Sequence, residues 1–204
     1  MKPIFVDISG VYRGNLYIGA LKASSSQIND VLNSSFYTRL RDRHKKIPSY
    51  KELRRKEEVK KVVDVLDDYG LEYSIGIFKR QVYGKFESKV QGKQDYKARL
   101  MSIFIYLTIR NLADCPDQLV CIEEGEYPNW QRIIQNRLSR WCSFSVSLKL
   151  ESKDSLGLLI ADHLAGFSRR FLGERIDRFN SNRLFIASPN TLKFYVEKEF
   201  DLNL

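Results

Sequence analysis

Residues 150–170 read LESKDSLGLLIADHLAGFSRR, and the spacing of their apolar residues predicts an amphipathic helix from Ser155 to Phe171. One carboxylate, Asp162, interrupts the apolar pattern. An ionised carboxylate among apolar side chains is costly unless a hydrogen-bond donor or a cation stabilises it. We therefore expect Asp162 to have a partner.

The residues that share the side of the helix with Asp162 indicate what that side can contact. Ala165, Gly166 and Arg169 fall on the same side of the helix, so small residues there let the helix approach a sheet or a substrate backbone closely. Arg169 can contact a phosphate. His163 projects about 100° away and is predicted to be a polar residue at the boundary of the core rather than a ligand.

Two other acids follow short apolar runs that resemble strands. Asp7 comes after PIFV, and Glu123 comes after LVCI. If the two strands are parallel neighbours, they lie about 4.8 Å apart, and the two carboxylates repel each other unless a cation separates them or one is protonated. Because hard divalent cations prefer oxygen ligands, we expect Asp7, Glu123 and Asp162 to hold Mg²⁺ or Mn²⁺, with Glu124 as a further candidate ligand.

Each acid also has an ordinary structural interpretation. A single Asp after a first strand is a common turn residue, and Glu124 and Glu126 in the stretch EEGEY are consistent with solvated loop charges. Asp162 is the hardest of the acids to explain without a partner, because it lies in the middle of a helix among apolar residues.

The rest of the chain alternates between strand and helix patterns, which predicts one α/β domain over residues 1–204. A glycine-containing turn at residues 11–15 predicts an opening β-hairpin. The expected elements are strands at Pro3–Val6, Leu16–Leu21, Leu71–Arg80, Gln118–Ile122 and Trp141–Leu150, helices at Ser49–Tyr69, Asp95–Leu112, Trp130–Leu138 and Ser155–Phe171, a loop from residue 81 to Gly92, and a tail, 184–204, that adds a strand and a helix begun by Ser188.

The chain is basic, with a formal charge of +9 and a pI near 9.4, which favours a polyanionic partner. Residues 39–61 hold 11 Lys or Arg against 4 acids, a balance of +7, and Tyr50 lies among them. A solvated helix with internal charge pairs is the alternative interpretation of this stretch. We expect residues 39–69 to form a basic helical insertion after the second strand that contacts nucleic acid through Arg39, Arg41, Arg43, Lys45, Lys46, Arg54 and Arg55, with Arg169 added from the later helix.

Cysteine and hydropathy patterns narrow the class of protein. Cys115, Cys121 and Cys142 lack metal-binding spacing and are expected to be buried thiols. The N-terminus lacks an apolar stretch of signal-peptide length, and uninterrupted apolar segments of membrane-spanning length are absent. We expect a soluble, cytoplasmic protein.

Two motifs resemble the family called domain of unknown function 3800. FVDISG at residues 5–10 followed by LYIGAL is similar to the family's opening strand with Asp-Glu-Ser-Gly, and SLGLLIADHLAG at residues 155–166 is similar to its closing Gly-Leu-Gln-Leu-Ala-Asp helix. The resemblance covers roughly residues 3–172 and implies a ribonuclease H-like fold, here a mixed five-stranded sheet flanked by helices. It also implies a metal-dependent nuclease site at Asp7 and Asp162, with Glu123 as the acid after the fourth strand. Ile8 stands where the family has its opening Glu.

These patterns lead to the hypothesis of a metal-dependent nuclease that hydrolyses RNA or DNA. The departure at Ile8 keeps a second hypothesis open, a catalytically inactive module on the same fold that binds nucleic acid or joins a complex. A PIN-like nuclease is a third and weaker alternative, because its parallel opening fits the hairpin at residues 11–15 poorly.

Overall fold

The computed structural model describes residues 1–10, 14–53, 56–114, 117–124, 129–142, 145–152, 154–171 and 183–203. In this part of the chain the strands form one mixed sheet in the order β5-β4-β1-β2-β3-β6. The strands are β1 (Ile4–Gly10), β2 (Leu16–Lys22), β3 (Glu72–Phe78), β4 (Gln118–Glu123), β5 (Val146–Glu151) and β6 (Leu184–Ile186). β2 is antiparallel to β1 and β3, and β4 runs parallel to both β1 and β5.

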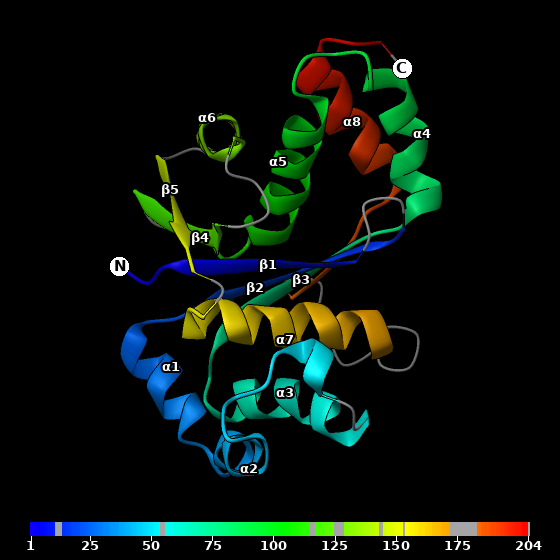
Figure 1. The fold of residues 1–204 in the computed structure, drawn as a ribbon. Helices are drawn as coiled ribbons and strands as arrows, with labels where there is room; N and C mark the ends of the chain where they lie inside the picture. Colours follow the sequence, from blue (N-terminus) through cyan, green and yellow to red (C-terminus); the bar gives the residue numbers. More distant parts are fainter. Residues whose placement is uncertain are drawn as a thin grey trace.

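Helices cover both faces of the sheet (Figure 1). One layer contains α1 (Ser25–Leu32), α2 (Ser35–His44), the short 3₁₀ helix η1 (Tyr50–Glu52), α3 (Lys56–Asp68) and α7 (Leu156–Phe171). The opposite layer contains α4 (Arg80–Val90), α5 (Tyr96–Ile109), α6 (Gln131–Trp141) and α8 (Pro189–Phe200). Within the described residues, no helix is long and apolar enough to cross a membrane.

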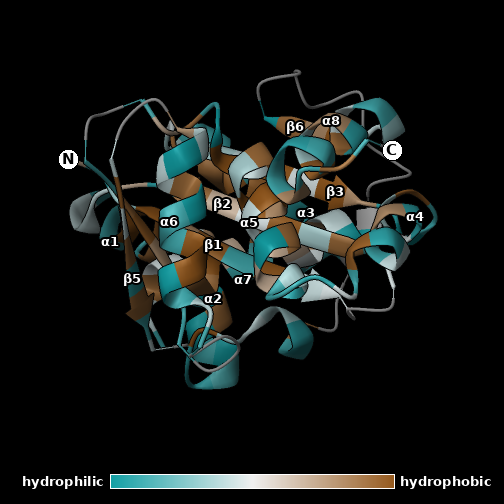
Figure 2. Cartoon of the chain, turned by 90° about the horizontal axis from the view of Figure 1, so that it is seen from above, coloured by the Kyte–Doolittle hydropathy of each residue, from teal (hydrophilic) through white to brown (hydrophobic). Residues whose placement is uncertain are grey.

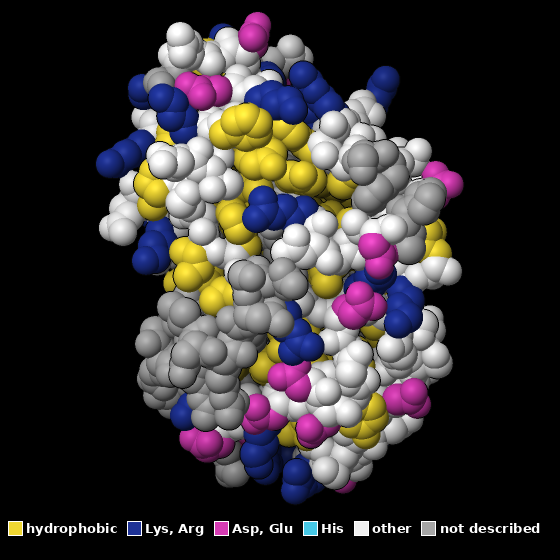
Figure 3. Space-filling view, turned by 180° about the vertical axis from the view of Figure 1, so that it is seen from behind, with side chains coloured by type: hydrophobic (Ala, Val, Ile, Leu, Met, Phe, Trp, Pro, Cys, Tyr) yellow, Lys and Arg dark blue, Asp and Glu magenta, His cyan; other side chains and the backbone are white. Residues whose placement is uncertain are grey.

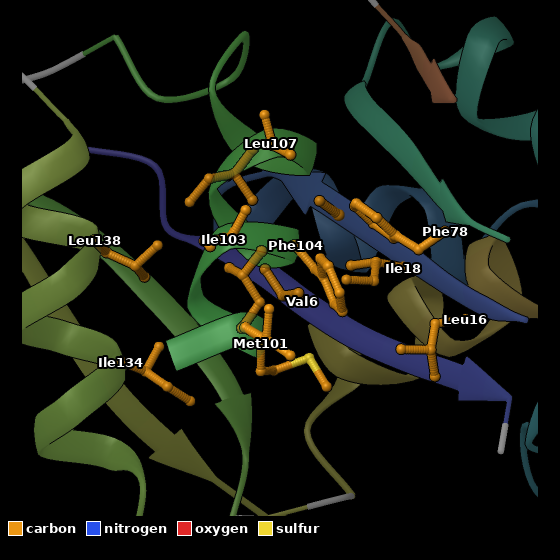
Figure 4. Packing of buried hydrophobic residues seen from close by; sticks show 14 of the residues in the cluster. Val6, Leu16, Ile18, Phe78, Met101, Ile103, Phe104, Leu107, Ile134 and Leu138 are labelled. Atoms are coloured by element: carbon orange, nitrogen blue, oxygen red, sulfur yellow. The ribbon is translucent and has the colours of Figure 1, made fainter. Parts of the chain in front are cut away.

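The alternation of side chains along the strands divides the core into two clusters. Val6 and Ile18 face α5, where Ile103 and Phe104 point toward the sheet and meet Phe78 (Figure 4). The next residues along the strands face α7 and the helices outside it. Hydrophobic residues accordingly concentrate in the interior, while the outer helices carry long hydrophilic stretches (Figure 2). This two-sided burial is the general architecture predicted from the strand and helix patterns.

The sheet has six strands where the sequence predicted five, because the tail contributes β6 as a full member. β6 pairs in parallel with β3, and Ser188 caps α8 through its side chain, as expected for that helix. The tail is therefore part of the sheet rather than an extension outside it.

The expected loop after β3 is wrong, since residues 80–90 form α4. Tyr83 and Val90, two turns apart, are buried, and Arg80 pairs with Glu87 along the helix. The helix was not predicted because its apolar side is narrow and the stretch contains frequent Lys and Arg residues and Gly84.

The expected helix Ser49–Tyr69 is also wrong in its first part. Ser49 caps η1 in a capping box with Glu52, but Leu53 turns extended and its carbonyl accepts a hydrogen bond from Arg170 at 2.8 Å. A contact from α7 thus takes the acceptor that a continuous helix would have used, and α3 starts afresh at Lys56. Arg54 and Arg55 lie outside the described residues.

Two boundaries differ from the prediction for reasons of tertiary packing. Trp141 ends α6 rather than starting a strand, because its ring packs against Tyr106 and Tyr195. Asp7 lies inside β1, paired with Gly19, rather than after the end of the strand.

His163 was predicted at the boundary of the core, but its side chain is fully buried. Its Nδ1 lies 3.1 Å from the hydroxyl of Tyr37 in α2, and its Nε2 lies 2.8 Å from the carbonyl oxygen of Pro48. Burial lowers the pKa of His163 below its ordinary value, although the Pro48 carbonyl and Asp162 act in the opposite direction. The imidazole is therefore neutral in the fold and ties α7 to the segment between β2 and β3.

We predict that Gly19→Ala destabilises the fold by about 1–3 kcal/mol. A Cβ at Gly19 would lie 2.3 Å from the carbonyl oxygen of Ala161 and 2.7 Å from the amide nitrogen of Ala165, and backbone atoms cannot move aside cheaply. Urea denaturation measures the change. Gly92→Ala is the matched control, since nothing lies within 4 Å of the added atom. Equal stability of the two variants would contradict the packing described here.

We further predict that stability falls as the pH drops from about 8 to 5.5 because of His163. Its pKa is lower in the fold than the value of about 6.5 in the unfolded chain, so the unfolded state takes up a proton first. The stabilisation is complete above the unfolded pKa and is lost as the pH falls below it. Denaturation midpoints measured across this range should show a shallower pH dependence in His163→Gln than in the wild type. An unchanged slope would exclude His163 as its source.

Candidate metal centre

The sheet brings two of the predicted acids onto neighbouring strands. The parallel ladder pairs Ile4 with Val120 and ends at Val6 with Ile122. Continuing this register by one residue sets Asp7 opposite Glu123, with both side chains on the same face of the sheet. Both residues are half-buried. The predicted neighbour relation between the first and fourth strands is thus confirmed, and the two acids lie where their shared ladder ends.

A further acid that sequence reasoning missed continues this row. Glu151 at the end of β5 pairs with Glu123, so Asp7, Glu123 and Glu151 stand on three adjacent strands. Burial acts to raise the pKa of Glu151, but hydrogen bonds from Ser155 and Lys149 outweigh it and the pKa is lowered. Glu124 follows as an exposed residue whose amide nitrogen donates to the carbonyl oxygen of Glu151 at 2.9 Å. The signal available in the sequence was a glutamate at the end of an alternating strand.

Two glycines fix how closely α7 lies on this face. A Cβ on Gly157 would meet the ring of Phe5 at 2.5 Å, and Gly19 lies against the backbone of Ala161. Since Asp7 pairs directly with Gly19, the register sets Asp7 beside the turn of α7 that carries Asp162. The predicted close approach to the sheet is confirmed for Ala165, whose amide nitrogen lies against Gly19, but not for Gly166, which lies against Tyr50.

Asp162 has a protein partner in the structure. Its Oδ2 accepts a hydrogen bond from the backbone N–H of Tyr50 at 2.7 Å. The ring of Tyr50 covers Gly166, one turn later on the same side of α7, where an added Cβ would lie 2.0 Å away. Arg170 stacks over that ring at 4.7 Å. The expected partner of Asp162 is therefore the backbone amide at the start of η1.

Charges gather around this contact. Burial raises the pKa of Tyr50, and the nearby Arg170 and Arg169 oppose that shift. Arg169 is exposed, and its contact with a phosphate stays a prediction. Asp162 therefore accepts a hydrogen bond from the backbone of a tyrosine whose side chain lies near two cations.

Among the residues that the structure describes, no group of three or more His, Cys, Asp or Glu side chains is arranged to hold a metal ion. The oxygen donors of Asp7, Glu123 and Asp162 suit Mg²⁺ or Mn²⁺ by their chemistry. Asp7 and Glu123 lie on a pair of neighbouring strands, and Asp162 lies on the helix that packs on the same face of the sheet. The carboxylate of Asp162 points to Tyr50.

The predicted basic insertion is partly a network of internal charge pairs. Arg43 of α2 pairs with Glu58 of α3, and Lys46 lies 2.9 Å from Glu52. Arg39, Arg41 and Lys45 are exposed on and just after α2, and no acidic partner is found for them in the described part of the chain. The interpretation as internal charge pairs therefore holds for Arg43 and Lys46. Contact of Arg39, Arg41 and Lys45 with nucleic acid stays a prediction.

The segment is also not a surface addition. Its apolar residues belong to the core cluster beneath α7. They include Leu40, Tyr50, Leu53, Val62, Val63 and Leu66. Residues 39–69 build part of the helical layer on this face of the sheet. That they are an insertion after the second strand stays a prediction.

The cysteines agree in part with the prediction of buried thiols. Cys121 is buried in β4 and Cys142 is half-buried after α6, while Cys115 lies outside the described residues. Burial raises the pKa of the Cys121 thiol to about 12 and that of Cys142 to about 11, so both are protonated at neutral pH.

Comparisons with known proteins give matches at the level of structure alone. No model of a known protein family matches the sequence, and a search of curated proteins finds no significant match. Bst-RNase HIII in complex with Mn²⁺ is similar with a TM-score of 0.56 and 13% identity over 87% of this chain, which spans only 54% of that protein. Ribonuclease H2 from Pyrococcus horikoshii OT3 gives a TM-score of 0.52 and 14% identity, covering 100% of this chain and 90% of that one.

RNase HII from Archaeoglobus fulgidus, solved in complex with PCNA, gives a TM-score of 0.50 at 10% identity, covering 98% of this chain and 89% of that one. Because the identities are this low, these similarities establish the fold alone. The chain has a ribonuclease H-like α/β fold, with a mixed six-stranded sheet flanked by helices.

Proposed function

We propose that the protein is a metal-dependent nuclease that hydrolyses phosphodiester bonds of RNA or DNA. The observation that carries the proposal is the register of β1 and β4, which sets Asp7 opposite Glu123 on the face covered by α7. The fold shared with RNase HII and RNase HIII supports a nuclease activity, and the Mn²⁺ in one of those structures supports a divalent cation.

In this proposal Asp7 and Glu123 hold Mg²⁺ or Mn²⁺, with Asp162 and Glu124 as further ligands. The bound cation would activate a water and stabilise the leaving oxygen. The strands set the backbone positions of these two ligands, Asp7 inside β1 and Glu123 at the end of β4. For Asp162 to join them, its carboxylate must use one oxygen for the metal while the other keeps the Tyr50 N–H.

The substrate in this proposal is held by cations. Arg39, Arg41 and Lys45 are exposed on one segment, and Arg169 projects from α7 beyond the acid. Together with Arg43, Lys46, Arg54 and Arg55 they would contact backbone phosphates without reading sequence. Membership in the family of domain of unknown function 3800 is part of the same proposal and rests on the motifs at residues 5–10 and 155–166.

The second candidate is an inactive module that binds nucleic acid or joins a protein complex. Two observations favour it: Ile8 stands where the resembled family has a Glu, and Asp162 is already stabilised by the amide of Tyr50. A site without metal would leave the basic surface intact.

We predict that wild-type protein cleaves mixed RNA and DNA substrates when Mg²⁺ or Mn²⁺ is added, and that Asp7→Asn lowers the rate by at least about 100-fold. A metal ligand contributes several kcal/mol to the transition state, and Asn keeps the shape of the side chain. Asp30→Asn on the exposed surface of α1 is the control and should retain full activity.

The same variants separate the two candidates by thermal unfolding. Mn²⁺ should raise the unfolding temperature of the wild type and of Asp30→Asn, but not of Asp7→Asn or Asp162→Asn. Asn at position 162 keeps an oxygen that can accept from Tyr50, so a lost response reports on the metal and not on that bond. Nucleic-acid binding without cleavage and without any Mn²⁺ response would favour the inactive module.

We predict that replacing Arg39, Arg41 and Lys45 together by Gln weakens binding to RNA and DNA of any sequence. Each lost phosphate contact should reduce the slope of log affinity against log salt by about 0.7 to 0.9. Fluorescence anisotropy at several salt concentrations measures both quantities. The matched control is Lys193→Gln on α8, an exposed lysine outside the proposed surface whose charge is paired with Glu197. A triple variant with an unchanged slope would place the nucleic-acid surface elsewhere.

A further inference from the structure

A cavity of about 320 Å³ lies at the start of α5, against the side of α6. It is lined by Gln94, Asp95, Arg99, Ile133, Asn136 and Arg137. Thr108 near the other end of α5 lies against Gly76 of β3, so the cavity is at the end of α5 that is remote from the sheet (Figure 1). It is therefore separate from the acids beneath α7.

Two arginines in this cavity are held by one buried carboxylate. The side chain of Glu199 in α8 has no exposed surface, and its Oε1 lies 2.7 Å from Nε of Arg99 and 3.0 Å from Nε of Arg137. Arg99 also donates to the backbone carbonyl oxygen of Glu199 and stacks on Phe200. Because Glu199 engages the Nε atoms, the terminal amino groups of Arg137 keep their N–H donors, for which the described residues supply no acceptor.

Two guanidinium groups and the carboxylates of Asp95 and Glu199 lie at this cavity, and the ion pairs of both arginines go to Glu199. One carboxylate is shared by two guanidinium groups, and its other oxygen, Oε2, is buried without a hydrogen-bond donor in the described part of the chain. Asp95 begins α5 with a left-handed backbone, φ 52°, and its side chain does not cap the helix. The first N–H groups of α5 thus add the positive end of the helix dipole near the arginines.

The surface around this end of the molecule agrees with an anionic ligand. Seen from behind, Lys and Arg side chains predominate in the upper half, which contains α4, α5, α6 and α8, whereas most of the visible Asp and Glu side chains lie in the lower half (Figure 3). A planar guanidinium matches the geometry of phosphate oxygens. A pair of guanidinium groups binds a dianion such as phosphate better than it binds a single carboxylate.

We propose that this cavity binds the phosphate group of a small phosphorylated molecule of about mononucleotide size. Arg137 and Arg99 contact the phosphate, and the amides of Gln94 and Asn136 contact the polar body of the ligand. The volume lies at the lower end of the range for small-molecule sites. The site is independent of the acids at Asp7 and Glu123, so it stands whether or not the protein is a nuclease.

Isothermal titration calorimetry with AMP, inorganic phosphate and adenosine tests this proposal on the full chain. We expect AMP to bind and adenosine, which lacks the phosphate, to bind at least about ten-fold more weakly. Arg137→Gln should weaken AMP binding about ten-fold or more, and Arg137→Lys should lie between Gln and wild type because it keeps the charge but not the fork.

Arg132→Gln is the matched control, since Arg132 is an exposed arginine of the same helix outside the cavity. Asn136→Asp provides a second variant at an exposed position, where the added negative charge should weaken AMP binding several-fold without removing an anchor of Glu199. AMP affinity that is equal in wild type, Arg137→Gln and Asn136→Asp would overturn the proposal, as would the failure of both AMP and phosphate to bind at millimolar concentration.

Discussion

The close packing of α7 on β1 and β2 is the constraint on which the rest of this structure depends. Gly157 and Gly19 leave no room for a Cβ between helix and sheet, so the helix has one position along the strands. That position decides which residues of α7 meet the sheet, which meet η1, and where Asp162 stands relative to Asp7. With larger residues in place of Gly157 on the helix and Gly19 on the sheet, the helix would lie farther away and the acids would be separated.

The same packing shows why part of the fold was accessible from the sequence. The strands, α5, α7 and α8 follow from apolar periodicity, since each buries a continuous stripe or run. The pairing of the first and fourth strands followed from the order of the elements. α4 was missed because its buried side is narrow and its exposed side is crowded with charge. The break between η1 and α3 depends on Arg170 reaching Leu53, a contact 117 residues apart that local patterns do not contain.

The candidate site was predictable to a similar degree. Asp7 and Glu123 were predicted because each follows an apolar run typical of a strand. The donor to Asp162 is a backbone amide, and a backbone amide cannot be recognised from the type of residue that carries it. Glu151 was overlooked because a glutamate closing an exposed alternating strand is a common solvated residue. His163 was misjudged because helical geometry gives the direction of a side chain without showing what covers it, and here α2 and the segment around Pro48 do so.

His163 links two regions that the chain separates by more than a hundred residues, and its two ring nitrogens are both used in doing so. The helical stretch between β2 and β3 supplies those contacts together with a large share of the hydrophobic residues under α7. It follows that this stretch is not a detachable module: a shortened protein lacking it would expose an imidazole and an apolar helix side at once. A minimal version of the fold would need a redesigned α7. Moving the stretch onto a relative would also require moving the side of α7 that packs against it.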